Sequence, residues 1–210
     1  MKKIVYSILM FILLLGCSEN LEQVYPMGPT GDDFFKTERD LQFAVVAAYA
    51  GLTNERGIWN VDMWGVEAMS DNAYAIADAP YTIWDSFEFD PTNQLVTNFY
   101  RYLYVAINRA NLVLLNAPNI EGIAQADMDN YMGQVYFLRG YEYFLLTLLY
   151  EDVPIVLQPS DQPEGFSLPA SSASQVYEQV IADLLLAEQL LPETQSEAGR
   201  IVKKAATAML

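Results

Sequence analysis

Apolar residues recur every three or four positions in five parts of the chain, a spacing that places them on one face of an α-helix. These parts span residues 38–52, 95–116, 127–149, 172–191 and 199–210. Pro118 and Pro192 close the second and the fourth, and Ser172 with Gln175 gives the fourth a capping-box pattern at its start. The third is apolar nearly all round towards its end, which predicts a central helix.

The segments between these helices are irregular. Residues 54–94 are rich in Asp, Asn, Gly, Trp and Tyr, and within them residues 82–89 predict a short extended piece. Residues 152–157 predict a second extended piece, which a Pro/Ser-rich loop at 158–173 follows. Paired antiparallel helices with Ala- and Tyr-rich contact faces predict a mostly α fold, a tetratricopeptide-like helical repeat (an α-α superhelix) with long irregular loops.

The first residues have the pattern of an export signal. Met1, Lys2 and Lys3 form a short positive start, and residues 4–15 are an apolar run that is too short to span a bilayer as a helix. Leu14-Leu15-Gly16-Cys17 is similar to a lipobox, in which the cysteine thiol becomes the site of lipid attachment. We therefore predict a lipoprotein signal peptide at 1–16, a lipidated tether at 17–37 and a helical domain at 38–210.

Composition and charge exclude several classes of function. Lys and Arg total 11 against 27 Asp and Glu, a net charge of −16, which argues against binding to nucleic acid or to anionic lipid surfaces. The absence of histidine removes most zinc sites and Ser-His-Asp or Cys-His catalysis, and the single cysteine, Cys17, allows no internal disulfide. With no phosphate loop, metal cluster or nucleophile motif either, we expect no catalytic residue, metal or cofactor.

Aromatic residues are abundant, with 14 Tyr, 10 Phe and 3 Trp. Most of them are expected in the core, but Tyr and Trp also suit exposed recognition surfaces. In the irregular region, Tyr81 and Trp84 could stack on the apolar faces of sugar rings while Asp and Asn bind the hydroxyls. The alternative is that these aromatics pin the region onto the helices, and that Asp71 and Asn72, beside Tyr74, cap a helix.

Arg139 lies in an otherwise apolar helix. Because an unpaired buried charge is too costly, we predict that it pairs with a carboxylate such as Asp152 or Glu142, rather than contacting a ligand. Asp152, directly before Val-Pro, is itself predicted to be a turn residue.

A series of segments follows the export signal in a recognisable order. They are Phe35–Leu41, Ala44–Tyr49, Ser70-Asp71, Tyr104–Asn111, Phe137–Tyr141, Tyr150–Ile155, a pattern from Tyr177 to Pro192, and Gly199-Arg200. Each is weak alone, but together and behind a lipobox they resemble the SusD/RagB family of outer-membrane nutrient-binding lipoproteins. Gly140 stands where the family usually has alanine, and Glu151 where it usually has glycine. Residues 201–203 also differ from the family's usual Ala-Thr-Lys/Arg, and these departures concern packing and a turn.

The resemblance implies a function. Such lipoproteins are anchored in the outer membrane facing the cell exterior, capture oligosaccharides or peptides, and pass them to a SusC-like TonB-dependent transporter without covalent chemistry. Binding aromatics of the family come from the stretch after the Ser-Asp pair, so the candidate ligand-binding residues here are Trp84, Tyr81, Asn93, Asp71 and Asn72. Because family members are longer and the last helix has no stop signal, we expect these 210 residues to be an N-terminal fragment.

Two other functions remain open. A helical-repeat scaffold for an envelope complex would lack clustered aromatics on one exposed surface. A lipid-anchored glycoside hydrolase would need two carboxylates at a defined separation, for example Asp71 with Asp85 or Glu88. The 27 acidic residues offer so many pairs that no single pair is informative.

Overall fold

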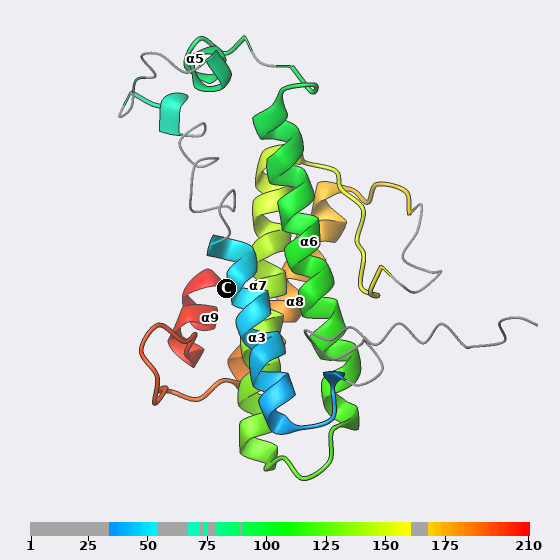
Figure 1. Ribbon diagram of the computed structural model, residues 1–210. Helices are drawn as coiled ribbons and strands as arrows, with labels where there is room; N and C mark the ends of the chain where they lie inside the picture. Colours follow the sequence, from blue (N-terminus) through cyan, green and yellow to red (C-terminus); the bar gives the residue numbers. More distant parts are fainter. Residues whose placement is uncertain (1–33, 54–66, 72–73, 75–78, 89, 161–167) are drawn as a thin grey trace, which may run out of the picture. The chain divides into compact units, whose positions relative to one another are not determined.

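The computed structural model describes residues 34–53, 67–71, 74, 79–88, 90–160 and 168–210. Its contacts divide the chain into two units at residues 34 and 35, and the following account concerns the second, residues 35–210. The helices are α3 (Glu38–Thr53), α5 (Ala79–Asp85), α6 (Gln94–Asn116), α7 (Gln125–Tyr150), α8 (Ala173–Leu190) and α9 (Lys203–Met209), with a 3-10 turn at Ala117–Asn119 (Figure 1). Within the described residues, no helix combines the length and the apolar character needed to cross a membrane.

The helices are arranged around α7. The antiparallel helices α6 and α7 pack against each other, α3 packs on both of them, and α8 packs on α7 and carries α9 (Figure 1). This arrangement confirms the prediction that the third helix is central. It also explains why that helix is apolar on most sides, since it has neighbours on most sides.

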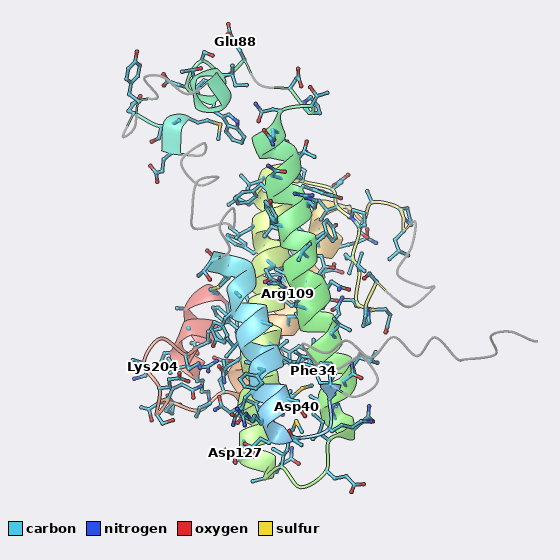
Figure 2. All side chains as sticks on the ribbon, viewed as in Figure 1. Phe34, Asp40, Glu88, Arg109, Asp127 and Lys204 are labelled. Carbon is cyan, nitrogen blue, oxygen red and sulfur yellow. The ribbon has the colours of Figure 1, made fainter. Side chains whose placement is uncertain are left out.

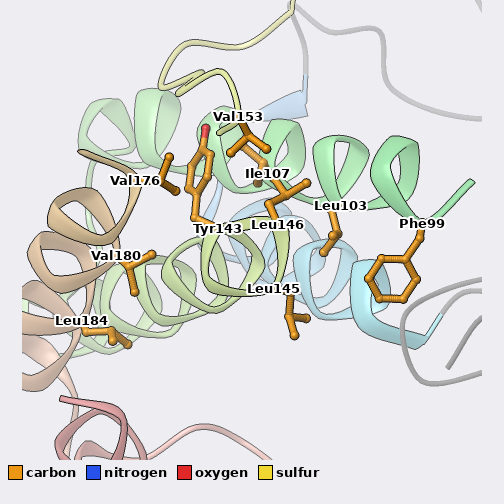
Figure 3. Close-up of a cluster of buried hydrophobic side chains, with 10 residues drawn as sticks. All are labelled: Phe99, Leu103, Ile107, Tyr143, Leu145, Leu146, Val153, Val176, Val180 and Leu184. Carbon is orange, nitrogen blue, oxygen red and sulfur yellow. The ribbon is translucent and has the colours of Figure 1, made fainter. Parts of the chain in front are cut away.

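The predicted apolar faces meet in one core. It contains ten buried residues: Phe99, Leu103, Ile107, Tyr143, Leu145, Leu146, Val153, Val176, Val180 and Leu184 (Figure 3). The helices α6, α7 and α8 supply nine of these residues, and Val153 is the tenth. On α7 the structure fully buries Glu142, whereas Leu148 is 58% exposed.

The capping box at the start of α8 is confirmed. The Ser172 hydroxyl accepts a hydrogen bond from the Gln175 backbone N–H at 3.4 Å, and the Gln175 side chain accepts one from the Ser172 N–H at 3.0 Å. The Asp152 carboxylate accepts a third from the Ala173 N–H at 2.8 Å. These side chains satisfy N–H groups that have no partner inside the helix.

One prediction about the irregular segments is wrong. Residues 82–88 of the predicted extended piece at 82–89 are not extended, because α5 occupies Ala79–Asp85 and Phe87 follows in the left-handed region at φ 56°. The aromatic and β-branched residues there suggested a strand, but Pro80 suits the first turn of a helix. At residues 152–157, where a second extended piece is predicted, the structure has an isolated antiparallel bridge between Val153 and Ser171 and no named strand.

Gly51 marks the closest approach of α3 to α6. A Cβ placed there would overlap the Cβ of Ala106 and lie 3.5 Å from a carboxylate oxygen of Glu142. Although alanine is the better helix former, we expect Gly51→Ala to lower the free energy of unfolding by about 1–3 kcal/mol through overpacking. Urea denaturation measures this, with Ala47→Ser on the exposed face of α3 as control. An unchanged midpoint for Gly51→Ala would contradict the close crossing.

Candidate ligand-binding site

One side of α6 holds the segment that follows α7. Tyr104 donates a hydrogen bond from its hydroxyl to the Pro154 carbonyl at 2.6 Å, and the Asn108 side-chain oxygen accepts one from the Ser160 N–H at 2.7 Å. The two side chains lie four residues apart, so they project from the same face of the helix. Residues 154–160 are thereby fixed alongside α6.

A buried asparagine and tyrosine hold the middle of the same segment. The Asn111 amide donates to the carbonyls of Val156 and Gln158 at 2.9 and 3.3 Å. The Tyr143 hydroxyl donates to the Val156 carbonyl at 2.8 Å and accepts from the Val156 N–H at 2.6 Å. Burial, the largest effect, raises the pKa of Tyr143, so its phenol stays protonated and can both donate and accept.

Behind Asn111 lies a buried ion pair. The guanidinium of Arg139 donates to both carboxylate oxygens of Asp183, at 2.8 and 2.7 Å, and to the side-chain oxygen of Asn111 at 2.9 Å. Arg139 is 6% exposed and Asp183 is 1% exposed. Burial opposes the charge on Arg139, but the hydrogen bonds and the charge of Asp183 outweigh it, so the pKa of Arg139 lies above its ordinary value.

The prediction that Arg139 pairs with a carboxylate is confirmed, but the predicted partners, Asp152 and Glu142, are wrong. Asp152 caps α8 instead, and both Glu142 carboxylate oxygens are buried without a hydrogen bond. The true partner, Asp183, lies on the apolar face of α8. An acidic residue within that buried stripe was the signal that could have identified it.

An open pocket of about 460 Å³ lies between α6 and the fixed segment. Its lining residues are Tyr100, Arg101, Tyr104, Val105, Asn108, Arg109 and Ser160. The Tyr100 and Tyr104 rings lie 4.8 Å apart at their centroids, and Tyr100 also packs edge-on against Tyr150 at 5.1 Å. The volume is typical of sites for small ligands, and sequence reasoning did not single out this pocket because one of its walls is a loop.

Two arginines line the pocket. Arg109, near the middle of α6 in Figure 2, donates to the Ala47 carbonyl at 3.1 Å. Arg101 donates to the hydroxyl of Tyr102 at 3.2 Å and lies over that ring, 5.0 Å from its centroid. Ion pairs in the part of the chain that the structure describes involve Arg139, Arg200 and Lys203, and thus neither of these two.

The structure brings together two of the five candidate residues predicted from the sequence. Trp84 is 7% exposed, packs with Ala68 and Val96, and donates from its indole N–H to the side-chain oxygen of Asn93 at 3.2 Å. Asn93 also accepts from the Val96 N–H at 3.4 Å. This geometry fits the alternative in which the aromatic residue pins the irregular region to the start of α6, whereas contact with a ligand stays a prediction.

The other three candidates are less defined. Asp71 is exposed, whereas Asn72, the side chain of Tyr81, and Cys17 lie outside the described residues. Two exposed aromatics of the same region were not singled out from the sequence: Tyr74, 75% exposed, and Phe87, 65% exposed. Exposed rings offer faces for stacking on sugars, and their pattern in the sequence does not distinguish them from core residues.

The described residues contain no group of three His, Cys, Asp or Glu side chains that could hold a metal ion. The described helices carry a pocket lined by tyrosine, asparagine and arginine side chains, residue types that suit the binding of small polar ligands. Residues 30–210 match the SusD-like family described as starch-binding and associating with the outer membrane. The chain belongs to this family, which confirms the resemblance found in the sequence. The members of the family are binding proteins rather than enzymes.

Individual relatives agree with this assignment. SusD-like protein P2 of Formosa agariphila is 31% identical over the whole of this chain, and SusD-like protein P25 of the same organism is 25% identical over 94% of it. A SusD superfamily protein from Bacteroides vulgatus has 25% identity and a TM-score of 0.76 over 83% of this chain. A laminarin-binding SusD-like protein has 24% identity and a TM-score of 0.73 over the same share.

These likenesses confirm the mostly α, tetratricopeptide-like fold. The chain spans 42% of the length of SusD-like protein P2 and 39% of the Bacteroides vulgatus structure.

Proposed function

We propose that this chain forms part of a surface lipoprotein that captures oligosaccharides and delivers them to a SusC-like TonB-dependent transporter in the outer membrane. The supporting observation is the family match over residues 30–210, together with 31% identity to one SusD-like relative over the whole chain. In this proposal residues 1–16 are removed, Cys17 carries the lipid, and the protein faces the cell exterior. Peptides are the alternative ligands.

Capture requires no covalent step. Aromatic faces stack on the apolar faces of sugar rings, and amide, carboxylate and guanidinium groups bind the hydroxyls. We propose that Asp71, Asn72 and Tyr81 contact the ligand, and that Trp84 and Asn93 hold the segment that presents them. The burial of Trp84 and its hydrogen bond to Asn93 support the part of this proposal that concerns Trp84 and Asn93.

A binding panel tests the proposal. We expect starch or laminarin oligosaccharides to bind saturably to the protein from residue 18 onward, with no release of reducing ends over the same period. Trp84→Ala should weaken binding about tenfold or more, because the segment loses its packing and its hydrogen bond. Tyr177→Ala, at an exposed aromatic of α8, is the matched control and should bind like the unchanged protein.

Each opposite result has a definite meaning. Turnover of the oligosaccharides would contradict capture without catalysis and favour a glycoside hydrolase. Binding of peptides alone would change the ligand class, and binding of neither would favour the scaffold function. Equal losses in Trp84→Ala and Tyr177→Ala would remove the assignment of the site to this segment.

A further inference from the structure

The distribution of positive charge distinguishes the pocket beside α6. The chain has 11 basic residues against 27 acidic ones, yet two arginines line this single pocket. Ion pairs between described residues use Arg139, Arg200 and Lys203, so Arg101 and Arg109 keep hydrogen-bonding capacity for another acceptor. A guanidinium has five N–H donors, and the contacts described for each of these two use only some of them.

The two arginines are arranged along the helix rather than side by side. They are eight residues apart, which corresponds to about 12 Å along the axis of α6. Tyr104 and Asn108 project between them on the same side of the helix, and Ser160 closes the opposite wall. An elongated ligand lying along α6 would therefore meet a cation at each end and aromatic and amide groups in between.

Among the described residues, Glu142 is an acidic group whose charge bears on Arg109. Glu142 is within electrostatic range of Arg109, but its carboxyl is fully buried and makes no hydrogen bond. Burial raises the pKa of Glu142 well above its ordinary value, which favours the neutral acid and leaves the charge of Arg109 available. More distant acidic residues are screened over about 8–10 Å at physiological salt.

We propose that this pocket binds an anionic oligosaccharide, whose carboxylate or sulfate groups accept hydrogen bonds from Arg101 and Arg109 while a sugar ring packs against Tyr100 and Tyr104. Guanidinium groups match carboxylate and sulfate oxygens in pairs. The tyrosine rings and the volume of about 460 Å³ suit a sugar better than the single side chain of a protein partner. This inference rests on the proposed function and adds to it a further pocket for anionic sugars, lined by residues other than Asp71, Asn72 and Tyr81.

The test compares charged and neutral forms of the same sugars by titration calorimetry on the protein from residue 18 onward. An oligogalacturonide is paired with its fully methyl-esterified form, and a sulfated oligosaccharide with its desulfated form. We expect at least one charged form to bind about tenfold or more tightly than its neutral counterpart. The arm that shows the difference identifies carboxylate or sulfate as the recognised group.

Variants assign the effect to the pocket. Arg101→Gln and Arg109→Gln should each weaken binding of the charged form about tenfold and leave the neutral form unchanged. Arg39→Gln removes the same charge at an exposed site of α3 and should have no effect. Because Arg109 also donates a hydrogen bond to the Ala47 carbonyl, the thermal stability of Arg109→Gln is compared with that of the unchanged protein. If Arg109→Gln is unstable, Arg101→Gln alone tests the pocket.

Four results would overturn the inference. Equal binding of charged and neutral forms would leave sugar capture intact but remove anion recognition, and so would equal losses in all three arginine variants. Arginine-dependent binding of an acidic peptide, without binding of any charged sugar, would assign the pocket to a protein partner. If no sugar of either form binds, the inference fails, whereas the proposed function is decided separately by the starch and laminarin oligosaccharides of the binding panel.

Discussion

Replacing Asp183 with alanine should lower the free energy of unfolding by about 3–5 kcal/mol, the range measured when one partner of a buried ion pair is removed. Asp183 accepts two hydrogen bonds from Arg139, and both side chains are almost completely buried. The variant therefore leaves a guanidinium charge inside the protein with only Asn111 as an acceptor. Urea denaturation at neutral pH measures the loss.

Two controls separate the buried charge from lost packing. Arg139→Met combined with Asp183→Leu removes both charges, so this double variant should recover most of the lost free energy of unfolding. It should therefore be more stable than the sum of the two single substitutions predicts. Glu197→Ala breaks the exposed pair with Arg200 and should change stability by less than about 1 kcal/mol. Similar losses in Asp183→Ala and Glu197→Ala would show that the Arg139 pair is not the buried pair described here.

The same substitution should also loosen the pocket wall. Asn111 accepts from Arg139 and donates to the carbonyls of Val156 and Gln158, so it connects the ion pair to the segment beside α6. We expect Asp183→Ala to increase amide exchange in residues 154–160 relative to α9. Unchanged exchange there would mean that Tyr104, Asn108 and Tyr143 fix the segment without the ion pair.

The helices could be predicted because their signals are local. The capping box at Ser172 and the stripes in α6 and α8 each depend on residues within a few turns of one another. The burial of Arg139 was also foreseeable, because a lone charge in an apolar helix needs a partner. The acidic residue on the apolar face of α8 made Asp183 a recognisable candidate, but the pairing itself depends on how α7 and α8 are aligned over a separation of 44 residues.

The pocket could not be predicted for the same physical reason. It forms because Tyr104, Asn108 and Asn111 bind backbone groups about 45–52 residues away, and no periodicity reports such hydrogen bonds. Trp84 shows that a local pattern can also predict a surface that the structure buries. Its sequence surroundings suggested an exposed stacking surface, whereas its apolar ring is buried and its N–H is bonded to Asn93, a combination that the residue type allows equally well.

Glu142 should make the protein less stable as pH rises. Its carboxyl is fully buried between α3, α6 and α7, both oxygens lack a hydrogen bond, and a Cβ at Gly51 would lie 3.5 Å from one of them. Burial raises its pKa well above the ordinary value of 4.5, and Asp183 contributes in the same direction, although Arg139 and Arg109 oppose this. The folded state therefore holds a proton that the unfolded state releases more readily.

This difference fixes the sign of the effect. Between the ordinary pKa of 4.5 and the raised one, the folded protein binds more protons than the unfolded chain, so the free energy of unfolding falls as pH rises through that interval. Glu142→Gln cannot titrate and should lack this fall. Glu142→Met, which has no buried polar group to satisfy, should be more stable than the unchanged protein by about 1–3 kcal/mol at alkaline pH.

Urea denaturation of the three proteins at a series of pH values from mildly acidic to alkaline measures both effects. Glu178→Gln, at an exposed glutamate of α8, is the matched control and should follow the unchanged protein at every pH. If the unchanged protein and Glu142→Gln show parallel pH profiles, the carboxyl of Glu142 is not the group that titrates. If Glu142→Met is instead less stable than the unchanged protein at alkaline pH, the carboxylate has a partner that stabilises its charge. The packing of α3 on α6 and α7 would then depend on the charged form of Glu142.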